Sequence, residues 1–158
     1  MSVREPTAAD YPRMLEILAL ARADPRYCGN PDAAMPTLAE FTAFLQGKWV
    51  SVAVQGGRIV IYLVVWQGAP DRGVIEQFAF DPTEPQIVRY INDDRQAMYL
   101  DLLSLGIRTL TSEVGFARDI GFAAMAARGV AVQVGRDPET NRPSGSFTVT
   151  IDLETASG

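Results

Sequence analysis

The sequence predicts a single mixed α/β domain in which helices cover a central sheet. The chain has 158 residues, 47% of them hydrophobic, which is enough to bury about two thirds of its unfolded surface around one core. Two β-rich runs flank a Gly-Gly pair, and helical patterns stand before and after the strands. The expected order is a strand, two helices, three strands, a helix, a strand, a helix and a closing pair of strands.

Two capping patterns place the first two helices. After a short extended start, Thr7 and Asp10 fit the S/T-x-x-D/E pattern of a helix N-terminus, and the apolar residues that follow recur at helical spacing. The stretch 24–36 contains three prolines and a glycine and is expected to be a loop. Thr37 and Glu40 then form a second capping pattern, which predicts a short second helix.

The middle of the chain predicts three consecutive strands. The stretch WVSVAVQGGRIVIYLVVW, residues 49–66, is typical of a hairpin, because its Gly-Gly pair tolerates the positive φ angles of a tight turn. In the next run, VIEQFAF, alternation puts Val74, Glu76, Phe78 and Phe80 on one face. Glu76 is therefore expected to lie among apolar neighbours.

The remainder predicts a helix, a strand, a second helix and a strand pair. These elements are expected near residues 97–105, 107–114, 116–129, 130–134 and 146–153. The domain is expected to span 1–153, and the tail 154–158 to be frayed. The last strand is expected at an exposed edge of the sheet, where a homodimer could form.

Composition argues against several kinds of function. With 19 acidic and 14 basic residues the net charge is -5, which argues against binding nucleic acid through a basic surface. Histidine is absent, which excludes imidazole acid-base chemistry and most zinc or iron sites, so we expect no metal. Cys28 is the single cysteine and has no histidine to activate it, so we expect a non-catalytic loop residue.

Nothing in the sequence predicts a membrane location. The longest apolar run, residues 59–66, is far shorter than the roughly 20 residues needed to span a bilayer. The first ten residues contain no apolar signal region. We therefore expect a cytoplasmic protein.

The order of elements and several local stretches resemble the GNAT superfamily of N-acetyltransferases. VREPTAADYPRMLEILALA looks like the opening strand and first helix of that family. GGRIVIYLVVW looks like the second arm of its hairpin, and EQFAFDP is similar to its fourth strand and the Asp-Pro that follows. The resemblance covers nearly the whole chain. It implies a three-layer α/β/α fold with a mixed central sheet of about six or seven strands.

The resemblance also implies a site for acetyl-CoA or another acyl-CoA. In the family, main-chain groups of the fourth strand contact the pantetheine arm, and the matching region here is near Phe78 and Phe80. A carboxylate on the same strand often takes a proton from the acceptor amine, and the matching residue is Glu76. The loop between the first two helices, which contains Cys28, matches the region where the family usually builds its acceptor pocket.

The sequence departs from the family pattern where the pyrophosphate of acetyl-CoA would bind. The family loop reads R/Q-x-x-G-x-G/A, because glycines let several N–H groups point at one anion. The matching span, TEPQIVRYINDD at 83–94, has no glycine, and its Pro85 has no N–H to donate. In the fourth helix, Met125 occupies the position of the family's proton-donating Tyr, and Arg118 that of a common Asn.

The sequence allows two starting points for the third helix. A start near Asn92 would put Asp93 and Asp94 in the first turn, where they stabilise the helix dipole and repel a pyrophosphate. A start near Thr83 would instead leave Arg89 able to meet a phosphate. In that second case one helical face would carry Val88, Ile91, Arg95, Met98 and Leu102.

Two functions follow from these observations. The missing glycines and the missing Tyr favour a degenerate acetyl-CoA site in a non-catalytic binding or assembly module, such as a phage virion or accessory protein, which has a protein partner and no cofactor. The alternative is a diverged N-acyltransferase that moves an acyl group from acyl-CoA to a small amine acceptor. In that enzyme Glu76 would be the base, Phe78 and Phe80 would lie near the pantetheine arm, and Arg89 would contact the phosphates.

Overall fold

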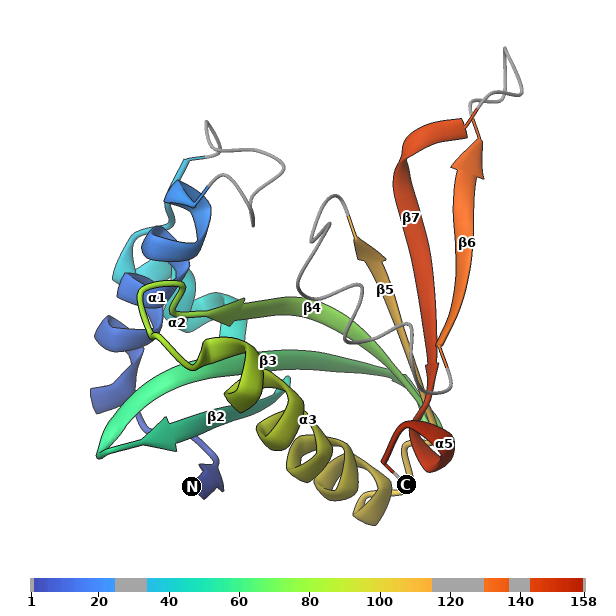
Figure 1. The fold of residues 1–158 in the computed structure, drawn as a ribbon, viewed down its shortest axis with the longest axis horizontal. Coiled ribbons are helices and arrows are strands. Elements are labelled where there is room, and N and C mark those ends of the chain that lie inside the picture. Colours follow the sequence, from blue (N-terminus) through green and yellow to red (C-terminus); the bar gives the residue numbers. More distant parts are fainter. Residues whose placement is uncertain (1, 25–33, 115–129, 137–142, 158) are drawn as a thin grey trace.

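The fold is a three-layer α/β/α arrangement around a mixed sheet, as the sequence predicts (Figure 1). It comes from a computed structural model that describes residues 2–24, 34–114, 130–136 and 143–157. The strands form a seven-stranded sheet in the order β1-β2-β3-β4-β5-β7-β6. Their bounds are β1 Ser2–Arg4, β2 Trp49–Gln55, β3 Arg58–Ala69, β4 Arg72–Phe80, β5 Thr109–Val114, β6 Val130–Arg136 and β7 Pro143–Asp152. The helices are η1 Ala8–Asp10, α1 Tyr11–Ala23, α2 Leu38–Leu45, α3 Ile87–Ser104 and α5 Leu153–Ser157.

Strand direction makes the sheet mixed. The β4–β5 pair is parallel, and every other neighbouring pair is antiparallel. The predicted β2–β3 hairpin is confirmed, with Gly56 and Gly57 at φ angles of +58° and +77° in its turn. Since residues with a Cβ rarely adopt such angles, the Gly-Gly pair sets both the position and the register of this hairpin.

Each face of the sheet has its own hydrophobic core. Helices α1 and α2 bury Met14, Ile17, Phe41 and Leu45 against Tyr62 and other residues of β2, β3 and β4. Helices α3 and α5 cover the opposite face and bury a larger cluster that includes Ile91, Met98, Leu102 and Leu153. The two layers of helices hold β3 and β4 between them, which fixes the position of the candidate site.

Both capping patterns that the sequence predicts are confirmed. Asp10 accepts a hydrogen bond from the Thr7 main-chain N–H at 2.8 Å, although the chain first makes the short 3₁₀ turn η1 before α1 begins. Glu40 and Thr37 exchange the two reciprocal bonds of a capping box, at 3.0 and 3.1 Å. Four main-chain N–H groups lack partners at every helix start, and these side chains satisfy some of them.

Two expectations for the C-terminal region are corrected. The last strand, β7, lies between β5 and β6 and is not at an edge of the sheet. The predicted frayed tail forms the short helix α5, because Leu153 is fully buried and Asp152 accepts hydrogen bonds from the N–H groups of Glu154 and Thr155. The predicted helix at 116–129 lies outside the described residues.

Gly73 lies where β3, β4 and β5 pack most closely. A Cβ added there would come within 2.6 Å of Val65 Cγ1 and 2.9 Å of Leu110 Cδ2, and both neighbours are fully buried. Gly73→Ala is therefore expected to lower the free energy of unfolding by roughly 1–2 kcal/mol, because the core must move to admit one methyl group. Urea unfolding measures this loss, and an unchanged midpoint would contradict it.

In the part of the chain that the structure describes, no helix is both long enough and apolar enough to cross a membrane.

Candidate functional site

Strands β4 and β5 separate along their second halves. They are paired only at 72–74 of β4 and 109–111 of β5, whereas β4 continues to Phe80 and β5 to Val114. Figure 1 shows the two strands diverging beyond these pairs. The sheet therefore opens at the carboxyl ends of two parallel strands, which is where ligands bind in open α/β sheets.

A β-bulge lies in β4 on the wall of this opening. Gln77 pairs with Val64 of β3, but Ile75 pairs with Val65, so Glu76 is an extra residue without a Cα partner in the β3 register. A bulge of this kind bends the strand and re-aims the side chains beside it. The bend in β4 coincides with the point at which β4 leaves β5.

The bulge corrects the predicted environment of Glu76. Strict alternation would put Val74, Glu76 and Phe78 on one face, but Val74 pairs with Trp66 whereas Phe78 pairs with Leu63 of the α3-side core. The two apolar residues thus lie on opposite faces, and Glu76 between them is exposed. Glu76 remains a candidate base, but as an exposed carboxylate and not as one held among apolar neighbours.

The main-chain N–H and C=O groups of Phe78 and Phe80 point to the β5 side of β4, whereas their rings pack with the α3-side core. Phe80 is 2% exposed, and both rings pack in or against the α3-side cluster. The Asp81 N–H donates to the Val60 carbonyl at 2.8 Å, which makes that pair a hydrogen-bonded one. Hydrogen-bonded and non-bonded pairs alternate in antiparallel ladders, so the N–H and C=O groups of Phe78 and Phe80 point away from β3, to the β5 side.

Tyr62 lies in the core on the other face and supports the bulge. It is fully buried, and its hydroxyl donates to Gln77 Oε1 at 2.7 Å. Burial raises the pKa of Tyr62, which keeps the hydroxyl protonated and able to donate. This bond ties the residue after the bulge to β3 and holds the bent part of β4 in place.

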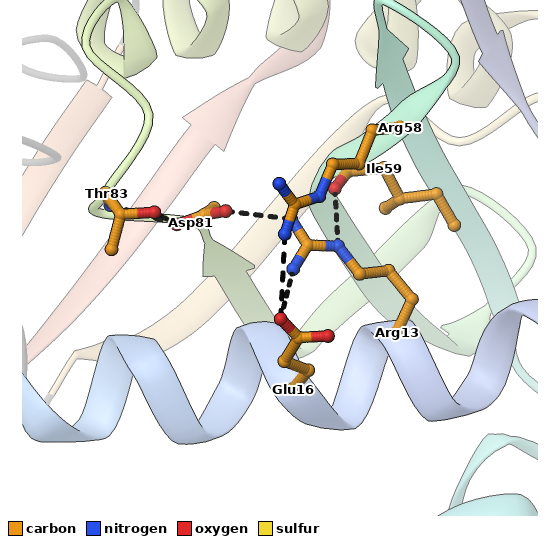
Figure 2. Close-up of polar contacts among 6 residues, drawn as sticks. All are labelled: Arg13, Glu16, Arg58, Ile59, Asp81 and Thr83. Atoms are coloured by element: carbon orange, nitrogen blue, oxygen red, sulfur yellow. Dashed lines mark hydrogen bonds and ion pairs between the residues drawn. The ribbon is translucent and has the colours of Figure 1, made fainter.

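A buried ionic cluster anchors the end of β4 to α1. Figure 2 shows Arg13 of α1 reaching Asp81, which follows β4, with the Nη2–Oδ2 distance at 2.8 Å. The Arg13 Nε also donates to the Ile59 carbonyl at 3.1 Å, and its Nη1 lies 3.0 Å from Glu16 Oε1. Only 3% of the Asp81 side chain is exposed, so its charge depends on these partners.

Asp81 also shapes the turn that leads into α3. Its Oδ1 accepts from the Thr83 N–H at 2.9 Å and from the Thr83 hydroxyl at 2.5 Å. Burial alone would raise the pKa of Asp81, but the hydrogen bonds from Thr83 and Arg13 outweigh it and lower the pKa. Sequence reasoning did not single out Asp81; an Asp followed two residues later by Thr is the turn signal that could have found it.

Helix α3 begins at Ile87, between the two starts that the sequence left open. Residues 82–86 form turns, and the first helical turn contains no acidic residue. Asp93 and Asp94 lie further along the helix, so first-turn acids do not repel a phosphate here. The face also differs from the expected one: the helix buries Ile87, Ile91, Asp94, Met98, Tyr99 and Leu102, whereas Val88 is 46% exposed.

A groove of about 570 Å³ lies at the N-terminal end of α3. It is lined by Pro85, Gln86, Val88, Arg89, Asn92 and Asp93. The Arg89 side chain is 74% exposed, and its Nε lies 3.8 Å from Asp93 Oδ2. Main-chain N–H groups of a first helical turn favour anions, and Arg89 adds a positive charge beside them. The groove therefore combines the start of a helix with one arginine, and no glycine contributes to it.

Three residues that the sequence singled out lie outside the described residues. They are Cys28, Arg118 and Met125. Within the described ranges, no group of three Cys, Asp or Glu side chains is arranged to hold a metal ion.

Comparisons with known proteins support the fold. No family model matches the sequence, and no curated protein matches it. The structure is similar over 97% of this chain to aminoglycoside 6'-acetyltransferase type Ii, covering 97% of that protein with a TM-score of 0.74 and 12% identity. A GNAT superfamily phosphinothricin acetyltransferase from Sinorhizobium meliloti, solved with AcCoA, matches 96% of this chain and 88% of its own, with a TM-score of 0.73 and 16% identity.

A third similar structure is the ribosomal-protein-alanine N-acetyltransferase from Brucella melitensis. It matches 96% of this chain and 99% of its own, with a TM-score of 0.64 and 17% identity. All three are similar to this chain over nearly their full lengths. The resemblance that the sequence showed in short stretches therefore holds for the whole architecture, and the chain is a GNAT-fold protein.

Proposed function

We propose that this protein is an N-acyltransferase that uses acetyl-CoA or another acyl-CoA as donor and a small amine as acceptor. The observation that supports it most is the opening between β4 and β5, with the bulge at Glu76 on its wall. Three features follow one another along the chain from β4 into α3. They are the Glu76 carboxylate, the main-chain groups of Phe78 and Phe80, and the groove beside Arg89. In that order an acyl-CoA would lie along β4 with its phosphates at the start of α3.

In this proposal the donor is held by the chain's own polar groups. The main-chain N–H and C=O groups of Phe78 and Phe80 on the β5 side of β4 would hydrogen-bond the pantetheine amides, as a neighbouring strand would. The pyrophosphate would lie in the groove at the start of α3, beside Arg89. An arginine supplies the charge that glycine N–H groups supply in the usual family loop.

Glu76 would act on the acceptor. An amine reaches the site as an ammonium ion and must lose a proton before its nitrogen can attack the thioester carbonyl. The exposed Glu76 carboxylate would accept that proton, directly or through a water. The new C–N bond forms, the C–S bond breaks, and the leaving thiolate takes up a proton to give free CoA. The products are an amide, CoA and the proton released from Glu76.

Acetyl-CoA is expected to raise the melting temperature of the full chain. A ligand at one hundred times its dissociation constant adds about 2.7 kcal/mol to stability, so millimolar acetyl-CoA should give a shift of several degrees. Arg89→Ala is expected to weaken binding roughly tenfold, because it removes a charged hydrogen-bond donor from the phosphates. Asp93→Asn should strengthen binding, since it removes the acid that faces Arg89 in the groove.

Arg108→Ala is the matched control for Arg89→Ala. Arg108 is 65% exposed and pairs with one acid, Glu154, but it lies before β5 and outside the groove. Its variant should bind acetyl-CoA like the wild type. If saturating acetyl-CoA leaves the melting temperature unchanged, the donor site does not exist, and the fold acts as a binding or assembly module instead.

A further inference from the structure

Trp66 is an exposed tryptophan beside the candidate site. Its side chain is 48% exposed, although residues 59–65, which precede it in β3, are all buried. Tyr62, Val64 and Trp66 alternate onto one face of β3, and the first two lie in the core under α1 and α2. Trp66 therefore continues that face beyond the area that the two helices cover.

Gly68 lets the indole lie flat along its own strand. A Cβ added at Gly68 would come within 3.0 Å of Cζ3 and 3.6 Å of Cη2 of Trp66. The six-membered ring thus rests over a residue that has no side chain. Among the described residues, the cations found over aromatic rings lie on Phe44 and Tyr99, and none lies on Trp66. The indole therefore rests on its own strand, and the residue is 48% exposed.

Glu76 lies close along the chain to the β4 partner of Trp66. Trp66 pairs with Val74 of β4, and Glu76 follows Val74 by two residues. Gln77 is on the Trp66 face, since it accepts the Tyr62 hydrogen bond, and Glu76 is the extra residue of the bulge next to it. Diagonal neighbours on adjacent strands are about 7–8 Å apart, within reach of an indole and a carboxylate that hold one ligand.

We propose that Trp66 selects the acceptor of the acyl transfer and that the acceptor is a cationic alkylamine without a carboxylate. This inference rests on the proposed function and names its substrate class. An indole face attracts a cation and packs against methylene groups, and Glu76 attracts the same ammonium group. An acceptor that also carried a carboxylate would be repelled by Glu76 and by the net charge of -5.

The test follows amine binding without acyl-CoA, so that it does not depend on the donor site. The chain has two tryptophans, which give two indole N–H signals in an NMR spectrum of the labelled full chain. The Trp66 signal is expected to move on titration with 1,5-diaminopentane. Trp49 packs against the α3-side core, and its signal should stay in place. 6-Aminohexanoate, which carries a carboxylate in place of the second amine, should bind roughly tenfold more weakly.

Variants separate the role of the ring from that of the fold. Trp66→Ala should weaken diamine binding roughly tenfold and raise the KM for the diamine with little change in kcat, whereas Trp66→Phe keeps most of the affinity. Gly68→Ala keeps Trp66 but displaces its ring, and should also weaken binding. Leu100→Ala removes a side chain that is 53% exposed on α3 and serves as the control.

Three results would overturn the inference: a Trp66 signal that does not move, equal affinities for the two amines, or a Trp66→Ala variant that binds like the wild type. If acetyl-CoA fails to bind while the diamine still moves the Trp66 signal, the proposed enzyme is wrong but the amine site stands. If acetyl-CoA binds and the diamine does not, only the acceptor assignment fails.

Discussion

Arg13→Ala is expected to lower the free energy of unfolding by about 3–5 kcal/mol, because it leaves the buried Asp81 carboxylate without its positive partner. The change also removes the bond from Arg13 to the Ile59 carbonyl and so detaches α1 from the ends of β3 and β4 (Figure 2). For a domain of this size the melting temperature should fall by about 10 °C or more. Chemical denaturation and thermal unfolding both measure the loss.

Arg58→Ala is the matched control for this prediction. Arg58 is 62% exposed and pairs with Glu16 at 3.6 Å, and Glu16 is also the exposed partner of Arg13. Exposed pairs contribute little, so the control should cost less than about 1 kcal/mol. The double variant Arg13→Ala with Asp81→Asn should recover part of the lost stability, since it also removes the buried negative charge that Arg13→Ala leaves unpaired. Equal losses of unfolding free energy for Arg13→Ala and Arg58→Ala would contradict a stabilising role of the buried Arg13–Asp81 pair.

The effect of Arg13→Ala should also depend on pH. The pKa of Asp81 is lowered in the folded protein, so its ionised form stabilises the fold above the ordinary aspartate pKa of about 3.9. That contribution is lost as the pH falls through the lowered value. The difference between wild type and variant should therefore be largest near neutral pH and shrink in acid.

Asp94→Asn is expected to raise the free energy of unfolding at neutral pH, by up to about 3 kcal/mol. Asp94 in α3 is fully buried, and no described residue donates to either carboxylate oxygen at hydrogen-bonding geometry. Burial raises its pKa from 3.8 to about 6; Gln55 on β2 opposes this rise, and Asp93 adds to it. A shift of two units corresponds to about 3 kcal/mol. An amide avoids the cost of a buried charge.

The sign of the pH dependence distinguishes this effect from a change in packing. Because the pKa of Asp94 is raised, the folded state holds a proton between pH 3.8 and about 6 that the unfolded state has lost. The wild type should therefore lose stability from this residue as the pH rises through that window. Asp94→Asn should show no such loss, so the gain should be complete above pH 6 and small near pH 4.

Asp93→Asn provides the comparison for Asp94→Asn. The Asp93 side chain is 53% exposed and pairs only loosely with Arg89, so this variant should change stability by less than about 1 kcal/mol at any pH. A pH-independent difference for Asp94→Asn, or a variant less stable than the wild type at pH 8, would contradict the buried-charge explanation.

Local sequence signals predicted the elements because each signal acts over a few residues. The Thr7–Asp10 and Thr37–Glu40 pairs cap helices through bonds three residues apart, and Gly56 and Gly57 accept backbone angles that few other residues adopt. The GNAT order of elements could therefore be read from the sequence. The tail at 154–158 was expected to fray, whereas residues up to Ser157 form α5, whose first residue, Leu153, is buried in one cluster with distant residues of α3.

The strand and helix that carry the candidate site were predicted, but the local form of that strand was not. Glu76 was found from its strand, yet the bulge that exposes it depends on how β3 pairs with β4, which alternation alone does not reveal. A start near Asn92 would have put Asp93 and Asp94 in the first turn; with the helix beginning at Ile87, Asp94 faces the core and only Asp93 lies in the groove, beside Arg89.

By itself, the sequence determined the GNAT-type order of elements, the absence of histidine chemistry and the glycine-free loop before α3. These properties depend on residue identity and short-range spacing. Only the tertiary structure decided that β4 parts from β5 after Val74, that Arg13 reaches Asp81 and that Trp66 is exposed. Each depends on residues that are not neighbours in the chain, because the packing of two helical layers on one sheet sets their distances.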